Sequence, residues 1–181
     1  MKQTVQSKLI LEMAATSEML GIASEIKPDV VTLVPEKREE LTTEGGLDAS
    51  AHQSVLQEAV SSLKNSGIQV SIFVDPDLDQ IKACQKVGSD MIEVHTGAFC
   101  EATSRLKKER EFARIVDSIK FASKLKLGVN AGHGICYNSI KAFKGLSQID
   151  EFSIGHSIVS RAVITGMEQA VRDMARLIRE L

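Results

Sequence analysis

The feature that most constrains the fold is a sixfold alternation of short apolar segments with longer helical patterns, joined by connections of a few residues. Such an order predicts a parallel α/β sheet, because parallel strands need a crossover connection that is usually a helix. The predicted strands cover residues 8–11, 30–34, 69–74, 91–94, 125–129 and 152–154.

Helical periodicity and end signals place helices between these strands. They are expected over residues 16–26, 51–65, 76–87, 107–124, 139–146 and 157–164, and from residue 167 to the end. Thr16 and Ser157 stand where N-cap residues are found, and Pro76 stands near the first position of its helix.

Polar residues follow the strands at their carboxyl ends. These are Glu12, the charged segment 36–46, Asp75, Glu93 with His95, Asn130 with His133, and Gly155 with His156. In a (β/α)₈ TIM barrel they would all meet at one rim. In an open doubly wound sheet they would meet only near a switch point. Their even distribution favours the barrel.

Six strand–helix units do not close an eight-stranded barrel. The first seven residues are typical of the tail of a helix rather than of the start of a domain. We therefore expect one incomplete (β/α) barrel domain over residues 1–181, of about six units with an extra helix before the last helix, and an absent part at the N-terminus.

Composition excludes several classes of function. The 181 residues carry a formal net charge of -2, which gives no electrostatic basis for binding nucleic acid or an anionic membrane. Apolar runs stay well below the ~20 residues of a membrane span, and the N-terminus does not fit a signal peptide. Three widely spaced cysteines (84, 100 and 136) predict reduced thiols in a cytoplasmic protein, and four scattered histidines predict no metal site.

Two glutamates are candidates for acid–base chemistry. Glu12 closes an apolar segment, so it is either a general base at the rim or an acidic residue that stabilises a helix start. Glu93 lies inside an apolar strand pattern, where an unpaired carboxylate is costly, which indicates a functional or tightly paired side chain.

Histidines and glycines follow the last three strands. His133 lies between glycines in NAGHG and suits proton transfer near neutrality, although a turn histidine facing water fits the same pattern. Gly155 and His156 precede a short extra helix, the place where many (β/α) barrels bind phosphate. Helix capping alone would also explain that pair. His95 fits either a ligand contact or a structural hydrogen bond.

Six segments together resemble the pyridoxine 5′-phosphate synthase family, in that family's order and spacing. They are LEMAATSEML, PEKREELTTEGGLD, VSIFVDPD, IEVHTG, GVNAGHG and IGHSIVSRA. The resemblance covers essentially the whole chain. It implies a TIM barrel that assembles into octamers, uses no metal or organic cofactor, and condenses 3-amino-1-hydroxyacetone 1-phosphate with 1-deoxy-D-xylulose 5-phosphate.

The resemblance also implies roles for individual residues. Glu12 would be a general base, His133 a proton donor and Glu93 a stabiliser of transition-state charge. Thr42 would contact the deoxyxylulose phosphate, and the amino-ketone phosphate would be held by Gly134, Gly155 and His156.

The chain departs from the family in one large respect. Two strand–helix units of the family, with a catalytic histidine and several phosphate contacts, have no counterpart before Met1. An inactive barrel that binds phosphate ligands or assembles with other chains is therefore the alternative function. A sugar-phosphate aldolase is a weaker alternative, because no lysine ends a strand to form a Schiff base.

Overall fold

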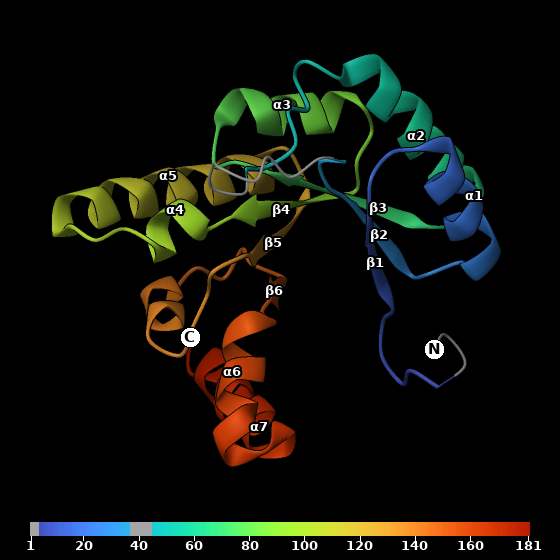
Figure 1. The fold of residues 1–181 in the computed structure, drawn as a ribbon. Helices are drawn as coiled ribbons and strands as arrows, with labels where there is room; N and C mark the ends of the chain where they lie inside the picture. Colours follow the sequence, from blue (N-terminus) through green and yellow to red (C-terminus); the bar gives the residue numbers. More distant parts are fainter. Residues whose placement is uncertain (1–3, 37–44) are drawn as a thin grey trace.

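A computed structural model describes residues 4–36 and 45–181 of the chain (Figure 1). Six parallel strands form one sheet, in which spatial order follows sequence order. The strands are β1 (Ile10–Met13), β2 (Val30–Leu33), β3 (Gln69–Val74), β4 (Met91–His95), β5 (Gly128–Gly132) and β6 (Glu151–Ser153). The predicted parallel α/β architecture is confirmed as an incomplete (β/α) barrel.

Helices follow the strands, and several of them cover the outer face of the curled sheet (Figure 1). They are α1 (Ser17–Ile26), α2 (Gln53–Asn65), α3 (Leu78–Lys86), α4 (Gly97–Cys100), α5 (Arg105–Lys124), α6 (His156–Thr165) and α7 (Met167–Arg179), with a 3₁₀ helix η1 (Ser139–Phe143). In Figure 1, α1, α2, α3 and α5 lie along the sheet, whereas α6 and α7 pack together below β6. No helix within residues 4–36 or 45–181 is long and apolar enough to cross a membrane.

The core lies between the sheet and these helices. Alternate strand residues such as Val31, Ile72 and Val129 are fully or almost fully buried, and they pack with the inner stripe of α2 and α5. Successive side chains of a strand point to opposite faces. The other face of the sheet, which lines the inside of the incomplete barrel, is therefore left to the residues between the apolar ones.

The sheet is open between β1 and β6, yet its two edges approach each other at one end. Lys8, just before β1, forms an ion pair with Glu151 of β6 at 2.5 Å. Both side chains are solvent-accessible, so the pair contributes little to stability. The ion pair does show that the sheet curls far enough for the segment before β1 to reach β6.

Aspartates pin the strands together in pairs. Each aspartate lies directly before one strand. Its carboxylate accepts a hydrogen bond from the backbone N–H at the start of the strand that comes before it in the sequence. The pairs are Leu9–Asp29 at 2.8 Å, Val70–Asp90 at 2.9 Å and Val129–Asp150 at 2.9 Å. In every pair the aspartate N–H also donates back to the partner's carbonyl oxygen. These bonds fix the register of β1/β2, β3/β4 and β5/β6.

Several predicted boundaries shift by one to three residues. The largest error concerns β5, which begins at Gly128 rather than at residue 125, because Lys126 adopts a left-handed conformation (φ 61°) in the turn that ends α5. Glu12 lies inside β1 instead of closing it. Pro76 precedes the true N-cap of α3, which is Asp77. Helix α4 was not among the predicted helices.

We predict that Asp90→Ala lowers the free energy of unfolding by about 1.5–3 kcal/mol, because the N–H of the fully buried Val70 loses a charged acceptor. Urea denaturation measures the loss. Asp90 also pairs with Lys64 at 2.7 Å. The matched control, Lys64→Met, removes that ion pair and the hydrogen bond from Lys64 to the Gly88 carbonyl oxygen at 3.0 Å. Both are solvent-accessible, so the control should cost below ~1 kcal/mol. Equal losses in the two variants would contradict the assignment.

Candidate active site

Polar side chains of the strands share the inner face of the sheet. Residues at equal register in parallel strands point to the same face. Glu12 pairs with Thr32, and Thr32 pairs with Ser71. One step further along the sheet, Glu93 pairs with Asn130. Thr32, Ser71, Glu93 and Asn130 are all buried although each is polar. The interior of the incomplete barrel is thus lined by polar groups toward the carboxyl ends of the strands.

The carboxyl of Glu93 has a strongly shifted pKa in this interior. Its side chain is 5% exposed, and its Oε2 accepts a hydrogen bond from the Ser153 hydroxyl at 2.9 Å. Burial raises the pKa of the Glu93 carboxyl from 4.5 to about 7. The Ser153 hydrogen bond opposes this rise in pKa, whereas the nearby Glu12 carboxylate adds to it. A carboxyl with such a pKa exchanges a proton near neutrality.

Gly132 makes room for this carboxyl. A Cβ at position 132 would lie 2.0 Å from Glu93 Oε1 and 2.9 Å from Ser153 Cβ. A side chain at this position would therefore push the Glu93 carboxyl out of its place beside Ser153. The glycine therefore belongs to the site as much as the carboxyl does.

His133 follows β5 directly and adopts a positive φ of 71°. Its backbone is held by Thr96, whose hydroxyl donates to the carbonyl oxygens of Gly132 and His133 at 2.9 and 2.5 Å. Gly134 follows with φ 76°. Positive φ is uncommon for a residue other than glycine, and the Thr96 hydrogen bonds help to hold the backbone in this conformation.

The loop after β5 meets the start of α6. Ser157 does not cap α6 as predicted, because its hydroxyl donates instead to the carbonyl oxygen of Ile135 at 2.8 Å. This bond joins the loop that contains Gly134 to the start of α6, where Gly155 and His156 are exposed. Three predicted phosphate contacts thus lie on adjacent segments, and no side chain caps the amino end of α6.

His95 makes the structural hydrogen bond that was one of its two predicted uses. Its Nδ1 lies 2.8 Å from Asp75 Oδ1. Its ring meets the His133 ring edge-on, with the centroids 5.0 Å apart. Phe73 contacts both imidazoles, at centroid distances of 5.1 and 6.4 Å. The two histidines therefore form one cluster at the carboxyl ends of β4 and β5.

Two further predicted site residues are Glu12 and Thr42. Glu12 is exposed on the edge strand β1, close enough to Glu93 for its charge to raise that residue's pKa. Thr42 lies outside the described residues.

The sequence analysis did not identify Ser153, Gly132 and Thr96, which hold the predicted residues in place. Ser153 could have been found as a polar residue inside an apolar strand pattern.

No cluster of three histidine, cysteine or acidic side chains within residues 4–36 and 45–181 could hold a metal ion. Cys84 is buried, and burial raises the pKa of its thiol to about 12, as expected of an unreactive core residue.

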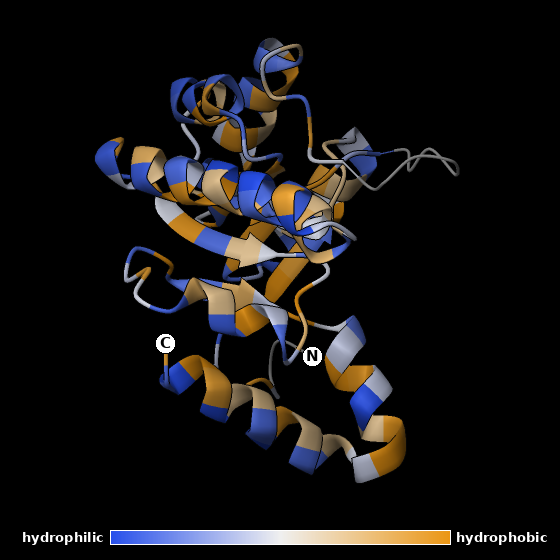
Figure 2. Cartoon of the chain, turned by 90° about the vertical axis from the view of Figure 1, so that its left-hand side faces the viewer, coloured by the Kyte–Doolittle hydropathy of each residue, from blue (hydrophilic) through white to orange (hydrophobic). Residues whose placement is uncertain are grey.

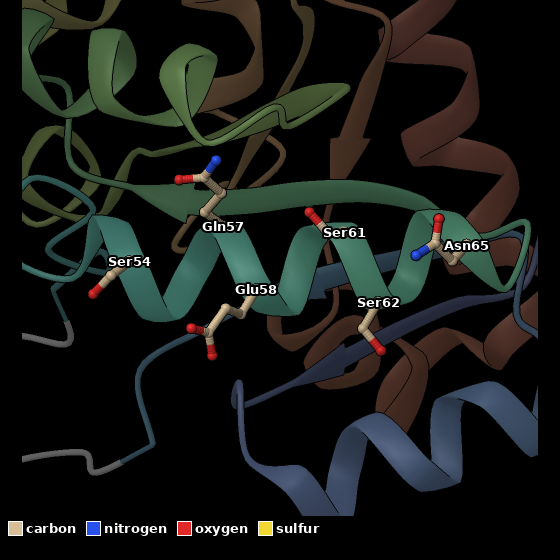
Figure 3. A pocket seen from close by; sticks show the side chains of 6 residues that line it. All are labelled: Ser54, Gln57, Glu58, Ser61, Ser62 and Asn65. Atoms are coloured by element: carbon tan, nitrogen blue, oxygen red, sulfur yellow. The ribbon is translucent and has the colours of Figure 1, made fainter.

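A shallow polar depression elsewhere runs along the outer face of α2 (Figure 3). A single helix supplies all six lining residues, so the depression lacks the convergent groups of an active site.

Comparison with known proteins decides the family. The family described as "Pyridoxal phosphate biosynthesis protein PdxJ" matches residues 1–180. This chain belongs to the PdxJ family. It is 65% identical to the pyridoxine 5′-phosphate synthase of Desulforapulum autotrophicum over 180 residues, and 55% identical to that of Geobacter sp. (strain M21) over 179. Each match covers 99% of this chain and 75% of the relative.

Solved structures agree on the fold. KGPDC from Streptococcus mutans superposes with a TM-score of 0.65 at 15% identity, covering 99% of this chain and 75% of that one. The tryptophan synthase A-subunit from Pyrococcus furiosus gives 0.62 at 13% identity, covering 99% and 68%. At these identities the likeness shows the (β/α) barrel fold alone. The predicted resemblance to pyridoxine 5′-phosphate synthase is confirmed at the level of the PdxJ family.

The raised pKa of Glu93 predicts a pH dependence of stability. The folded state binds this proton more tightly than the unfolded state, so the contribution is fully present below pH 4.5 and is lost as the pH rises through about 7. It amounts to on the order of 3 kcal/mol. Urea denaturation of Glu93→Gln across this range should lack that fall in the free energy of unfolding.

The exposed Glu58 of α2 provides a matched control. Glu58→Gln removes a carboxyl of the same type from the solvated face of a helix and should leave the pH profile unchanged. If the profiles of Glu93→Gln and the wild type coincide, the pKa assignment is wrong.

Proposed function

We propose that this protein is a pyridoxine 5′-phosphate synthase. It would condense 3-amino-1-hydroxyacetone 1-phosphate with 1-deoxy-D-xylulose 5-phosphate and release phosphate and water. Membership of the PdxJ family supports the proposal, together with relatives of up to 65% identity that carry the name pyridoxine 5′-phosphate synthase. The observation that carries it is the convergence of Glu93 and the His133 loop on one rim.

Glu12, Glu93 and His133 divide the proton transfers in this proposal. A condensation that loses water and phosphate needs a base to take a proton from carbon and an acid to protonate leaving oxygens. Glu12, exposed to solvent on β1, acts as the base. His133 acts as the acid. Glu93, with a pKa of about 7, stabilises charge that develops between them.

Phosphate binding falls to backbone groups in the same proposal. Gly134, Gly155 and His156 offer backbone N–H groups at a positive-φ turn and at a helix start, arrangements that suit an anion. Thr42 contacts the deoxyxylulose phosphate. No organic cofactor or metal takes part, and the protein works in the cytoplasm as a homo-oligomer.

A second candidate function draws on the open sheet. Within the described part of the chain, β1 and β6 are unpaired edges, and such edges invite pairing with another chain. Hydrophobic residues also recur along α6 and α7 (Figure 2). Several of their side chains are exposed, among them Val163 at 80% and Ile164 at 85%. The alternative is an inactive barrel that binds phosphate ligands or takes part in an assembly.

Incubation of the purified protein with both phosphorylated substrates, followed by mass spectrometry of the products, tests the proposal. We expect pyridoxine 5′-phosphate from the wild type. Glu93→Gln should lower kcat by about 10²–10³-fold, the range for loss of one stabilising group. His133→Gln should lower it by about 10²–10⁴-fold. Glu58→Gln serves again as the control and should retain full activity.

Other outcomes separate the two candidate functions. Calorimetric binding of either phosphorylated substrate without turnover would favour the inactive barrel. A stable monomer that neither turns over nor binds the substrates would exclude both.

A further inference from the structure

A buried imidazole lies between an aspartate and the proposed proton donor. His95 is 6% exposed, its Nδ1 is 2.8 Å from Asp75 Oδ1, and its ring touches that of His133. The hydrogen bond from His95 is the largest cause that holds the pKa of Asp75 below its usual value. An ionised carboxylate can only accept, so Nδ1 is the nitrogen that donates. In a neutral ring this leaves Nε2 as an acceptor.

The acceptor nitrogen faces the proposed proton donor. Among the described residues, Nε2 of His95 is buried and has no hydrogen-bond partner. A Cβ on Gly97 would lie 2.5 Å from this nitrogen and 3.1 Å from Cδ2 of His133. Nε2 and the His133 ring therefore border the same small space, which Gly97 keeps open. Burying a polar atom without a partner costs free energy, which points to a use for it at this site.

Residues 95–97 act on His133 as one unit. The ring of His95 contacts the His133 ring, and the Thr96 hydroxyl holds the His133 carbonyl oxygen. Gly97 supplies the space between them. Backbone held in a sparsely populated region costs on the order of 1–3 kcal/mol and persists only where surrounding contacts determine it. The side chain and the backbone of His133 are thus both set by the last residue of β4 and the two residues that follow it.

Asp75 is fixed in turn by a second donor. Its Oδ1 also accepts the N–H of Gly46 at 3.1 Å. Gly46 packs so closely on the end of β3 that a Cβ there would lie 2.2 Å from the backbone nitrogen of Asp75. The carboxylate is therefore held by the backbone of residue 46 and by the imidazole of residue 95 together.

We propose that Asp75 and His95 are positioning residues of the active site. Asp75 sets the His95 tautomer whose Nε2 is an acceptor, and His95 holds the His133 imidazole in the orientation from which it donates its proton. This proposal rests on the proposed function. Neither Asp75 nor His95 needs to touch the substrate, so their effect should fall on the rate of the chemical step rather than on binding.

Two substitutions separate the chemistry of this arrangement from its packing. His95→Phe keeps a ring beside His133 but removes both nitrogens, and Asp75→Asn keeps the shape but removes the charge that selects the tautomer. The same exchanges at exposed positions, His52→Phe before α2 and Asp79→Asn in α3, are the matched controls.

Nitrogen NMR of histidine-labelled protein gives the readout that packing alone would not move. The wild type should show His95 protonated at Nδ1 and unprotonated at Nε2. Asp75→Asn keeps the His95 ring packed against His133, so the expected loss of this preference and the expected shift of the His133 ring resonances would report on the tautomer rather than on packing. Steady-state kinetics should show kcat lowered by about 10–100-fold, the range for a misplaced catalytic group, with KM changed less than about threefold. The controls should match the wild type.

The outcomes distinguish this proposal from the proposed function. If the wild type makes no pyridoxine 5′-phosphate, the proposed function fails, and the NMR data alone decide whether Asp75 and His95 position His133. Unchanged His133 resonances in both site variants overturn the positioning role. So does an unchanged kcat in folded His95→Phe and Asp75→Asn, even where their thermal stability falls.

Discussion

The division of the sheet into an apolar face and a polar face is the constraint on which the rest of the structure depends. Val31, Ile72 and Val129 bury the outer face against helices. The period of two in a strand then sends the residues between them inward. Glu93 fits into the interior because it reaches a hydroxyl on Ser153 and a space left by Gly132, although the hydrogen bond offsets only part of the cost of its burial. The strand register that buries the apolar core residues therefore also positions the polar residues of the candidate site.

Much of the fold follows from the sequence because its signals are local. Apolar runs rich in β-branched residues, helix stripes and end glycines depend only on neighbouring residues, and they located every strand to within a few positions. β5 was placed too early because the left-handed turn at Lys126 consumes residues that look like a strand by composition. Helix α4 was missed because four residues carry no periodic pattern.

The sequence identified candidate residues of the site, but not the contacts that hold them in place. Glu93 and His133 stood out by residue type in their local setting. The side chains that support them come from other strands and loops: Ser153 lies 60 positions from Glu93, and Thr96 lies 37 from His133. Distant partners leave no periodic trace in one sequence. Ser157 makes the same point, since a residue placed to cap a helix bonds across to another loop.

The paired aspartates bear on how such a chain can be built and altered. Positions 29, 90 and 150 recur at nearly equal intervals, and each locks one strand to its predecessor without help from the next pair. Each two-strand unit therefore carries its own alignment device. Asp29 and Asp90 also reach the next pair, because their carbonyl oxygens accept the N–H groups of Gln69 and Gly128 at the starts of β3 and β5. The side chain of such an aspartate thus aligns two strands within a pair, and its backbone joins that pair to the next one.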